Sequence, residues 1–217
     1  MKRRAAIFDL DGTLLDTIED LTDSMNAALA AYGFPEKTVG ECRLLVGDGL
    51  ATFIHRALPE SRRDDPTFTA KLTAAMRAEY SRRCMIKTKP YPGIVAMLEA
   101  LRARGISLSI LSNKPQPATV DVVNRYFPGF PFRFVFGARE NVAIKPDPAA
   151  ALEIAAALSL PPAEILYLGD TNTDMQTAVA AGMFAVGALW GFRTENELLA
   201  NGAHALVTRP EDVLSYF

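Results

Sequence analysis

The chain has 217 residues, with 23 Lys and Arg against 25 Asp and Glu, a formal net charge of -2. Hydrophobic residues make up 49% of it, which is typical of a globular protein and too high for a disordered one. The nearly balanced charge argues against a nucleic-acid-binding protein with a broad basic surface. Its two cysteines cannot form a disulfide framework, and no apolar run is long enough to span a bilayer. We therefore expect a soluble, cytoplasmic protein.

Six short apolar segments predict the buried strands of a parallel sheet, because they lack the alternation of a half-exposed strand. They are Ala5–Leu10, Ser107–Ser112, Phe132–Phe136, Ile165–Gly169, Phe184–Ala188 and Ala205–Val207. Helical patterns lie between them, over Ile94–Leu101, Asp147–Leu158 and Thr173–Ala181. This alternation predicts an α/β fold with a doubly wound parallel sheet, Rossmann-like in architecture.

Residues 17–87 interrupt the alternation with helical patterns and no convincing strand. The chain returns to the sheet through Pro90–Gly93, a stiff turn suited to a hinge, and Leu14–Thr17 is the other expected hinge. We therefore expect a core of residues 1–16 and 88–217, with a helical domain of residues 17–87 inserted into it. Basic residues outnumber acidic ones over 60–89, which indicates either a solvated helix face or a surface that attracts an anionic substrate.

The first predicted strand ends in two carboxylates, Asp9 and Asp11, followed by Gly12. In open α/β sheets, ligands bind at the carboxyl ends of the strands. Two acids held there need a compensating charge, and oxygen ligands of this kind favour Mg²⁺. A calcium-binding loop is the structural alternative, but it would follow a helix and end in Glu, where this chain has Asp20.

Three later segments place polar residues at or just after other predicted strands. Ser112 and Asn113 can donate hydrogen bonds to a phosphate, although such a pair is also an ordinary helix-capping turn. Lys145 precedes a predicted helix and by itself could be a surface lysine. Asp170 would add a third carboxylate at the same sheet edge. Asp174 either interacts with a helix dipole or orients metal-bound water.

Together these segments resemble the four motifs of the haloacid dehalogenase-like hydrolases. The stretches that carry the resemblance are Asp9-Leu10-Asp11-Gly12-Thr13-Leu14-Leu15-Asp16, Ser112-Asn113-Lys114, Lys145-Pro146 and Gly169-Asp170-Thr171-Asn172-Thr173-Asp174. The resemblance covers essentially the whole chain, and the helical insert lies where that superfamily carries a type-1 cap. Val46–Gly49, Tyr91–Gly93 and Ala143–Pro148 further resemble the phosphoglycolate phosphatases of the superfamily.

The resemblance implies a mechanism and a Mg²⁺ site. Asp9 would attack phosphorus to form an aspartyl-phosphate, and Asp11 would serve as the general acid and base. The implied metal-binding residues are Asp9, Asp11 through its backbone carbonyl, Asp170 and, as a supporting group, Asp174. The implied phosphate-binding residues are Thr13, Ser112, Asn113 and Lys145. Asp11 favours phosphoryl transfer over dehalogenation, and Thr13 favours a phosphatase over a sugar-phosphate mutase.

Substrate choice is expected to depend on the cap. Gly47 and Gly49 indicate a loop that approaches the ligand closely. Arg43 or Arg56 could pair with a substrate carboxylate, such as that of phosphoglycolate, or could be ordinary surface arginines.

We therefore expect a Mg²⁺-dependent phosphatase acting on a small phosphorylated metabolite, 2-phosphoglycolate first, with no nucleic-acid or membrane partner. A pyrophosphatase or another small-metabolite phosphatase is the alternative, followed by a phosphomutase. A regulatory protein that binds a phosphorylated metabolite without turnover is the non-enzymatic alternative. The sequence leaves a monomer and a homodimer open.

Overall fold

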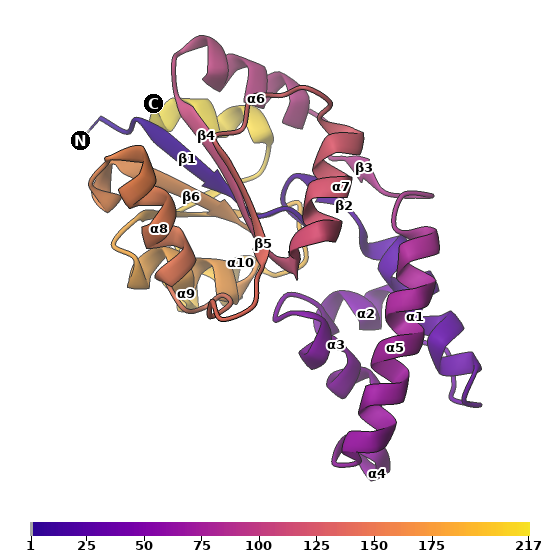
Figure 1. Cartoon of the computed structure of the whole chain (residues 1–217). Helices are drawn as coiled ribbons and strands as arrows, with labels where there is room; N and C mark the ends of the chain where they lie inside the picture. The colour runs from indigo at the N-terminus through magenta and orange to yellow at the C-terminus, as the bar shows by residue number, and fades with distance from the viewer. Residues whose placement is uncertain (1) are drawn as a thin grey trace. The chain divides into compact units, whose positions relative to one another are not determined.

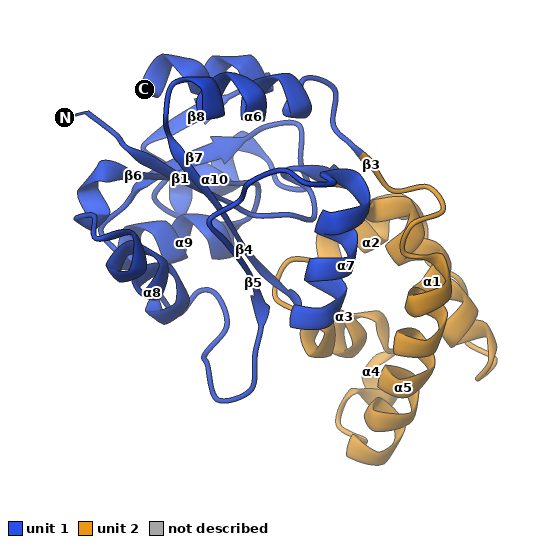
Figure 2. Ribbon diagram, turned by 45° about the horizontal axis from the view of Figure 1, so that its top comes forward, with its two compact units in different colours: residues 1–15, 90–217 blue, residues 16–89 orange. Residues whose placement is uncertain are grey.

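The chain forms two compact units in a computed structural model that describes residues 2–217. Of the described residues, unit 1 contains 2–15 and 90–217, and unit 2 contains 16–89 (Figure 2). The short strands β2 (Leu15–Asp16) and β3 (Lys89–Pro90) pair with each other where the chain passes between the units. The domain boundaries expected from the sequence, at residues 16 and 87, stay predictions.

Unit 1 is built around a six-stranded parallel sheet in the order β5-β4-β1-β6-β7-β8 (Figure 1). Its strands are β1 (Ala5–Phe8), β4 (Ser107–Pro115), β5 (Phe134–Ala138), β6 (Ile165–Gly169), β7 (Phe184–Ala188) and β8 (Ala205–Val207). The predicted fold class, a doubly wound parallel sheet, is confirmed. Three strands differ in extent from the prediction: β1 ends at Phe8 instead of Leu10, β4 continues to Pro115, and β5 covers Phe134–Ala138 instead of Phe132–Phe136.

Helices cover both faces of this sheet (Figures 1 and 2). They are α6 (Ile94–Ala103), α7 (Gln116–Tyr126), α8 (Ala149–Leu158), α9 (Asn172–Ala180) and α10 (Glu195–Ala200), with the 3₁₀ segments η1 (Pro162–Glu164) and η2 (Pro210–Tyr216). Ile154 of α8 and Met175 of α9 share one buried cluster with Tyr167 of β6. On the other face, α6 packs with η2 and buries Met97 and Leu101. Burial on both faces explains the unbroken apolar character of the strands.

The central strand β1 determines where polar residues meet. All four of its residues are completely buried, because it lies between β4 and β6 with Phe8 opposite Ile110 and Leu168. Parallel strands end at one edge of the sheet, so the residues that follow these three strands come together there. This register brings the segments after Phe8, Ile110 and Leu168 to a common edge.

Unit 2 is entirely helical apart from its two boundary strands (Figure 2). It contains α1 (Ile18–Ala30), α2 (Val39–Leu45), α3 (Leu50–Ala57), α4 (Glu60–Arg63) and α5 (Pro66–Arg83). Met25 of α1 and Met76 of α5 are completely buried where these two long helices pack. The buried Asp20 carboxylate accepts hydrogen bonds from the backbone N–H groups of Lys87 and Thr88, which ties the end of the unit to its first helix.

No helix among residues 2–217 is both long enough and apolar enough to cross a membrane.

Candidate active site

Three carboxylates meet at the carboxyl edge of the unit 1 sheet. Asp9 follows β1, Asp170 follows β6, and Asp174 lies in the first turn of α9. One carboxylate oxygen from each lies within 4.8 Å of the others, and all three residues are buried. Like charges this close repel strongly at low dielectric, so the cluster needs positive charge nearby.

Lys145 supplies part of that charge. Its Nζ lies 2.6 Å from Asp174 Oδ1 and 2.9 Å from Asp9 Oδ1, and the residue is buried. Burial lowers the pKa of Lys145, but Asp174 and Asp9 outweigh it and hold the pKa well above its ordinary value. Burial, with repulsion from Asp174, raises the pKa of Asp9 to about 7 even though Lys145 opposes the shift. The buried lysine and the acids therefore form one electrostatic unit.

The turn after β1 and the loop after β7 hold Asp170 in place. Thr13 Oγ1 donates to Asp170 Oδ1 at 2.6 Å, and the Phe192 backbone N–H donates to Asp170 Oδ2 at 2.8 Å. Gly12 and Gly191 leave room for this carboxylate, because a Cβ at either position would overlap it. Burial, with repulsion from Asp174 and Asp9, raises the pKa of Asp170 well above its usual range.

Asp174 is fixed by the start of its own helix. Thr171 caps α9: its hydroxyl accepts from the Asp174 N–H and donates to Asp174 Oδ2 at 2.7 Å, and its backbone N–H donates to the same oxygen at 3.0 Å. The Asp170 backbone N–H donates there as well, at 3.2 Å. This capping box leaves Oδ1 for Lys145.

The acidic cluster fits a divalent cation. When all three carboxylates are ionised, their negative charge exceeds the positive charge of Lys145 by two. A single Mg²⁺ would balance that difference. Carboxylate oxygens are the ligands that this hard cation prefers. Asp9, Asp170 and Asp174 are thus the side chains of the described chain that could bind it.

All four predicted phosphate-binding residues have side chains that contact protein groups, and the contacts of Lys145 are given above. The Thr13 hydroxyl donates to Asp170, as described above. The Asn113 side-chain amide forms two hydrogen bonds with the backbone of Lys145. It donates to the carbonyl at 3.0 Å and accepts from the N–H at 2.9 Å. Ser112 Oγ accepts from the Lys114 N–H at 3.3 Å. Their roles toward phosphate stay predictions.

The Asp11 side chain lies outside the acidic cluster and pairs with Lys114. Lys114 Nζ lies 2.8 Å from both carboxylate oxygens of Asp11. The sequence pattern does not indicate a role for Lys114, which directly follows Ser112 and Asn113. Only its position near the end of β4 points to the site, because ligands bind at that end of the strands.

The cap residues that are expected to contact and select the substrate lie in unit 2. The side chain of Arg56 on α3 pairs with Asp48 at 2.6 Å and donates to the Leu45 carbonyl at 3.3 Å. The intervening loop contains Gly47 and Gly49, which have φ of 119° and 84°, values that favour glycine. Arg56 therefore braces the loop, and Arg43 lies exposed on α2. The substrate contacts of these residues stay predictions.

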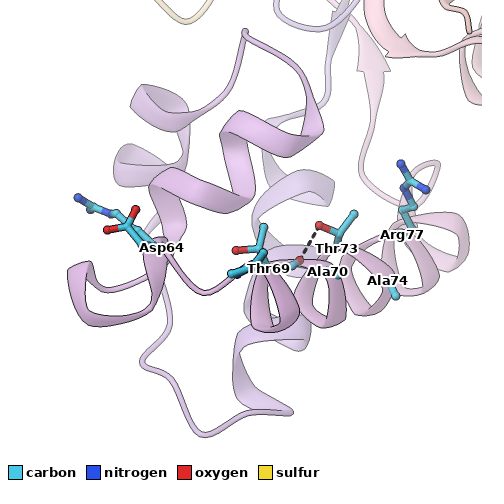
Figure 3. A pocket seen from close by; sticks show the side chains of 8 residues that line it. Asp64, Thr69, Ala70, Thr73, Ala74 and Arg77 are labelled. Atoms are coloured by element: carbon cyan, nitrogen blue, oxygen red, sulfur yellow. Dashed lines mark hydrogen bonds between the residues drawn. The ribbon is translucent and has the colours of Figure 1, made fainter.

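An open groove of about 770 Å³ runs along α5 within unit 2 (Figure 3). Its lining includes the small side chains of Ala70, Thr73 and Ala74, with Arg77 further along the helix. The Thr73 hydroxyl donates to the Thr69 carbonyl at 2.7 Å and is thus directed at the helix itself. Arg63 and Asp64 also line the groove, and none of its lining residues belongs to the acidic cluster.

Comparisons with known proteins find similar proteins over most of the chain. The family model described as haloacid dehalogenase-like hydrolase matches residues 6–188. The chain is 29% identical to phosphoglycolate phosphatase 1 of Pseudomonas aeruginosa over 213 residues, covering 97% of this chain and 78% of that protein. It is 33% identical to the phosphoglycolate phosphatase of Rhodospirillum rubrum over 197 residues, with 88% and 82% covered.

A solved structure from Lactobacillus delbrueckii subsp. bulgaricus, provisionally assigned as a phosphoglycolate phosphatase, superposes with a TM-score of 0.92 at 32% identity. The match covers 98% of this chain and 97% of that one. The family model, the relatives and the fold thus point to the same family. The chain belongs to the haloacid dehalogenase-like hydrolases and is an enzyme of that family.

Proposed function

We propose that this enzyme is a Mg²⁺-dependent phosphatase that hydrolyses a small phosphate monoester, 2-phosphoglycolate first. The observation that carries the proposal is the buried cluster of Asp9, Asp170 and Asp174 around Lys145. Its two surplus negative charges suit a cation, and the cation together with Lys145 suits a phosphate dianion. The names of the relatives support phosphoglycolate as the first substrate to test.

The residues of unit 1 would supply the nucleophile and the general acid and base of a two-step reaction. In the first step an oxygen of Asp9 forms a bond to phosphorus, the bond to the leaving oxygen breaks, and Asp11 gives that oxygen a proton. In the second step Asp11 takes a proton from water, whose oxygen attacks phosphorus. The bond to Asp9 then breaks, and both aspartates return to their starting states.

The remaining groups hold the reactants. Lys145 lies against the nucleophile, and both Lys145 and Ser112 would contact the phosphoryl oxygens. Asp9, Asp170 and Asp174 would hold Mg²⁺, together with the backbone carbonyl of Asp11, and the bound ion would offset charge on the phosphoryl group. Substrate selection would fall to Arg43, Gly47, Gly49 and Arg56 in the cap.

The test is phosphate release from a panel of 2-phosphoglycolate, pyrophosphate and a sugar phosphate, each with Mg²⁺ and with chelator. We expect Mg²⁺-dependent release that is fastest from 2-phosphoglycolate and is lost in Asp9→Asn. Asp121→Asn is the matched control, because Asp121 is exposed on α7 and should be dispensable.

Other outcomes would redirect or overturn the proposal. Equal release by wild type and Asp9→Asn would show that Asp9 is not the nucleophile. Fastest release from pyrophosphate would change the substrate class, and an isomerised sugar phosphate would indicate a mutase. Tight metabolite binding without turnover would favour a regulatory protein.

A further inference from the structure

Lys114 holds Asp11 by both carboxylate oxygens. Its Nζ lies 2.8 Å from Oδ1 and 2.8 Å from Oδ2. The Lys114 side chain is only 4% exposed, whereas that of Asp11 is 20% exposed. An ammonium buried to this degree is costly to keep without a charged partner, so the pair fixes both side chains. The Asp11 carboxylate therefore has a defined orientation instead of moving freely at the open side of the site.

The backbone of Lys114 is itself held from two elements. The Thr119 hydroxyl on α7 donates to the Lys114 carbonyl at 3.0 Å. Gly137 on β5 passes so close that a Cβ there would lie 2.5 Å from the same carbonyl oxygen. The Gln116 side chain joins β5 to the start of α7, since its amide accepts from the Gly137 N–H and donates to the Val135 carbonyl. This support fixes the point from which the lysine side chain reaches Asp11.

The two lysines of the site serve different carboxylates. Lys145 contacts Asp9 and Asp174, whereas Lys114 contacts Asp11. Asn113 precedes Lys114 in the chain and forms hydrogen bonds with the backbone of Lys145. Two consecutive residues near the end of β4 therefore help to place both lysines. Lys145 thus contacts the proposed nucleophile and cation site, whereas Lys114 contacts the proposed general acid and base, Asp11.

We propose that Lys114 is a positioning residue that aims the Asp11 carboxylate at the leaving oxygen and stabilises the carboxylate that remains after proton donation. The proposal rests on the proposed phosphatase function and deepens it. The proton passes from Asp11 to the leaving oxygen, and Lys114 keeps its own protons throughout. A displaced general acid loses much of its effect, about 10²-fold for a shift of 1 Å.

Lys114→Met tests this role through its dependence on the leaving group. An alkoxide needs a proton to leave, whereas p-nitrophenolate does not. The measured quantity is kcat/KM, which reports phosphoryl transfer to Asp9, for 2-phosphoglycolate, ethyl phosphate and p-nitrophenyl phosphate. We expect a fall of about 10²-fold for both alkyl esters and little change for p-nitrophenyl phosphate. Lys71→Met, at an exposed lysine of α5, should change none of the three.

Two further variants separate positioning from misfolding. Thr119→Val and Gly137→Ala should each disturb the Lys114 backbone and give the same ranking of substrates at a smaller amplitude. In an Asp11→Asn background, Lys114→Met should cause little additional loss, because two residues that act as one unit are not additive.

Three results would overturn the proposal. An equal loss on all three esters would mean that Lys114 supports only the structure of the site. A rise of KM confined to 2-phosphoglycolate would make Lys114 a contact for the substrate carboxylate. Wild-type protein that hydrolyses none of the esters with Mg²⁺ would overturn the proposed function itself, and this inference with it.

Discussion

The charged residues of the acidic cluster in unit 1 differ from those on the helix surfaces of unit 2. In unit 1, Asp9, Asp174 and Lys145 are buried and contact one another across segments far apart in sequence. In unit 2, several basic side chains pair with acids three or four positions away on the surface. These pairs are Arg62–Asp65, Arg63–Glu60, Arg82–Glu79 and Arg83–Glu79.

The buried charges and the surface charges call for different explanations. Exposed pairs three or four residues apart contribute little to stability and need no ligand to explain them. Buried acids that outnumber their lysine are short of positive charge, and the pKa values of Asp9 and Asp170 are raised accordingly. The paired basic residues over 60–89 fit a solvated helix face, and the alternative, a surface that attracts an anionic substrate, stays a prediction.

The largest effect should come from Lys145→Met, which removes the ammonium from the buried cluster. We expect kcat/KM to fall by about 10³-fold, because the phosphoryl group loses a preorganised positive charge. In chelator, the free energy of unfolding should fall by about 3 kcal/mol, since Asp9 and Asp174 lose their buried partner. Steady-state kinetics and urea denaturation measure the two effects. Unchanged stability, as expected for exposed Lys71→Met, would contradict the contrast between buried and surface lysines.

Asp170→Asn should separate stability from function. Removing one of three crowded carboxylates relieves repulsion, so the metal-free protein should gain about 1 kcal/mol of stability. Mg²⁺ should raise the Tm of the wild type, because a ligand that binds only the folded state stabilises that state. In Asp170→Asn, most of this Mg²⁺-dependent rise in Tm should be lost. Thermal unfolding with Mg²⁺ and with chelator tests both points. A destabilised metal-free variant that still responds fully to Mg²⁺ would argue against a cation at this cluster.

The smallest effect should come from the cap. Arg56→Met removes the ion pair with Asp48 and the bond to the Leu45 carbonyl, but both side chains are partly exposed. We expect a change of less than about 1 kcal/mol in stability, with KM raised several-fold and kcat preserved. Asp48→Asn should reproduce this if Arg56 acts by bracing the loop. A rise of KM in Arg56→Met alone would instead make Arg56 a direct substrate contact.

The sheet could be predicted because its strands are buried on both faces and therefore appear as short apolar runs in sequence. The start of β5 was misjudged for a related reason. Phe132 is equally apolar, but it packs edge-on against Phe127 and lies beside Phe130, so it belongs to an aromatic turn before the strand. Composition alone does not distinguish an apolar turn from a strand.

The acids of the site could be anticipated because each follows a strand that ends at one edge. The contacts of Asn113 and Lys114 could not. Asn113 binds the backbone of a residue 32 positions away, and Lys114 meets Asp11 across 103 positions. Such contacts depend on side-chain direction and loop placement, which a local pattern does not encode.

The most direct test of the account asks whether phosphate is transferred to Asp9. In Asp11→Asn, p-nitrophenyl phosphate should still phosphorylate Asp9, because its leaving group needs no proton, but hydrolysis should be slow for lack of a base. Borohydride reduction of the trapped acyl phosphate, followed by peptide mass spectrometry, should then find homoserine at position 9, dependent on Mg²⁺ and substrate. Release of p-nitrophenolate with Asp9 unmodified, or homoserine at another aspartate, would contradict the account.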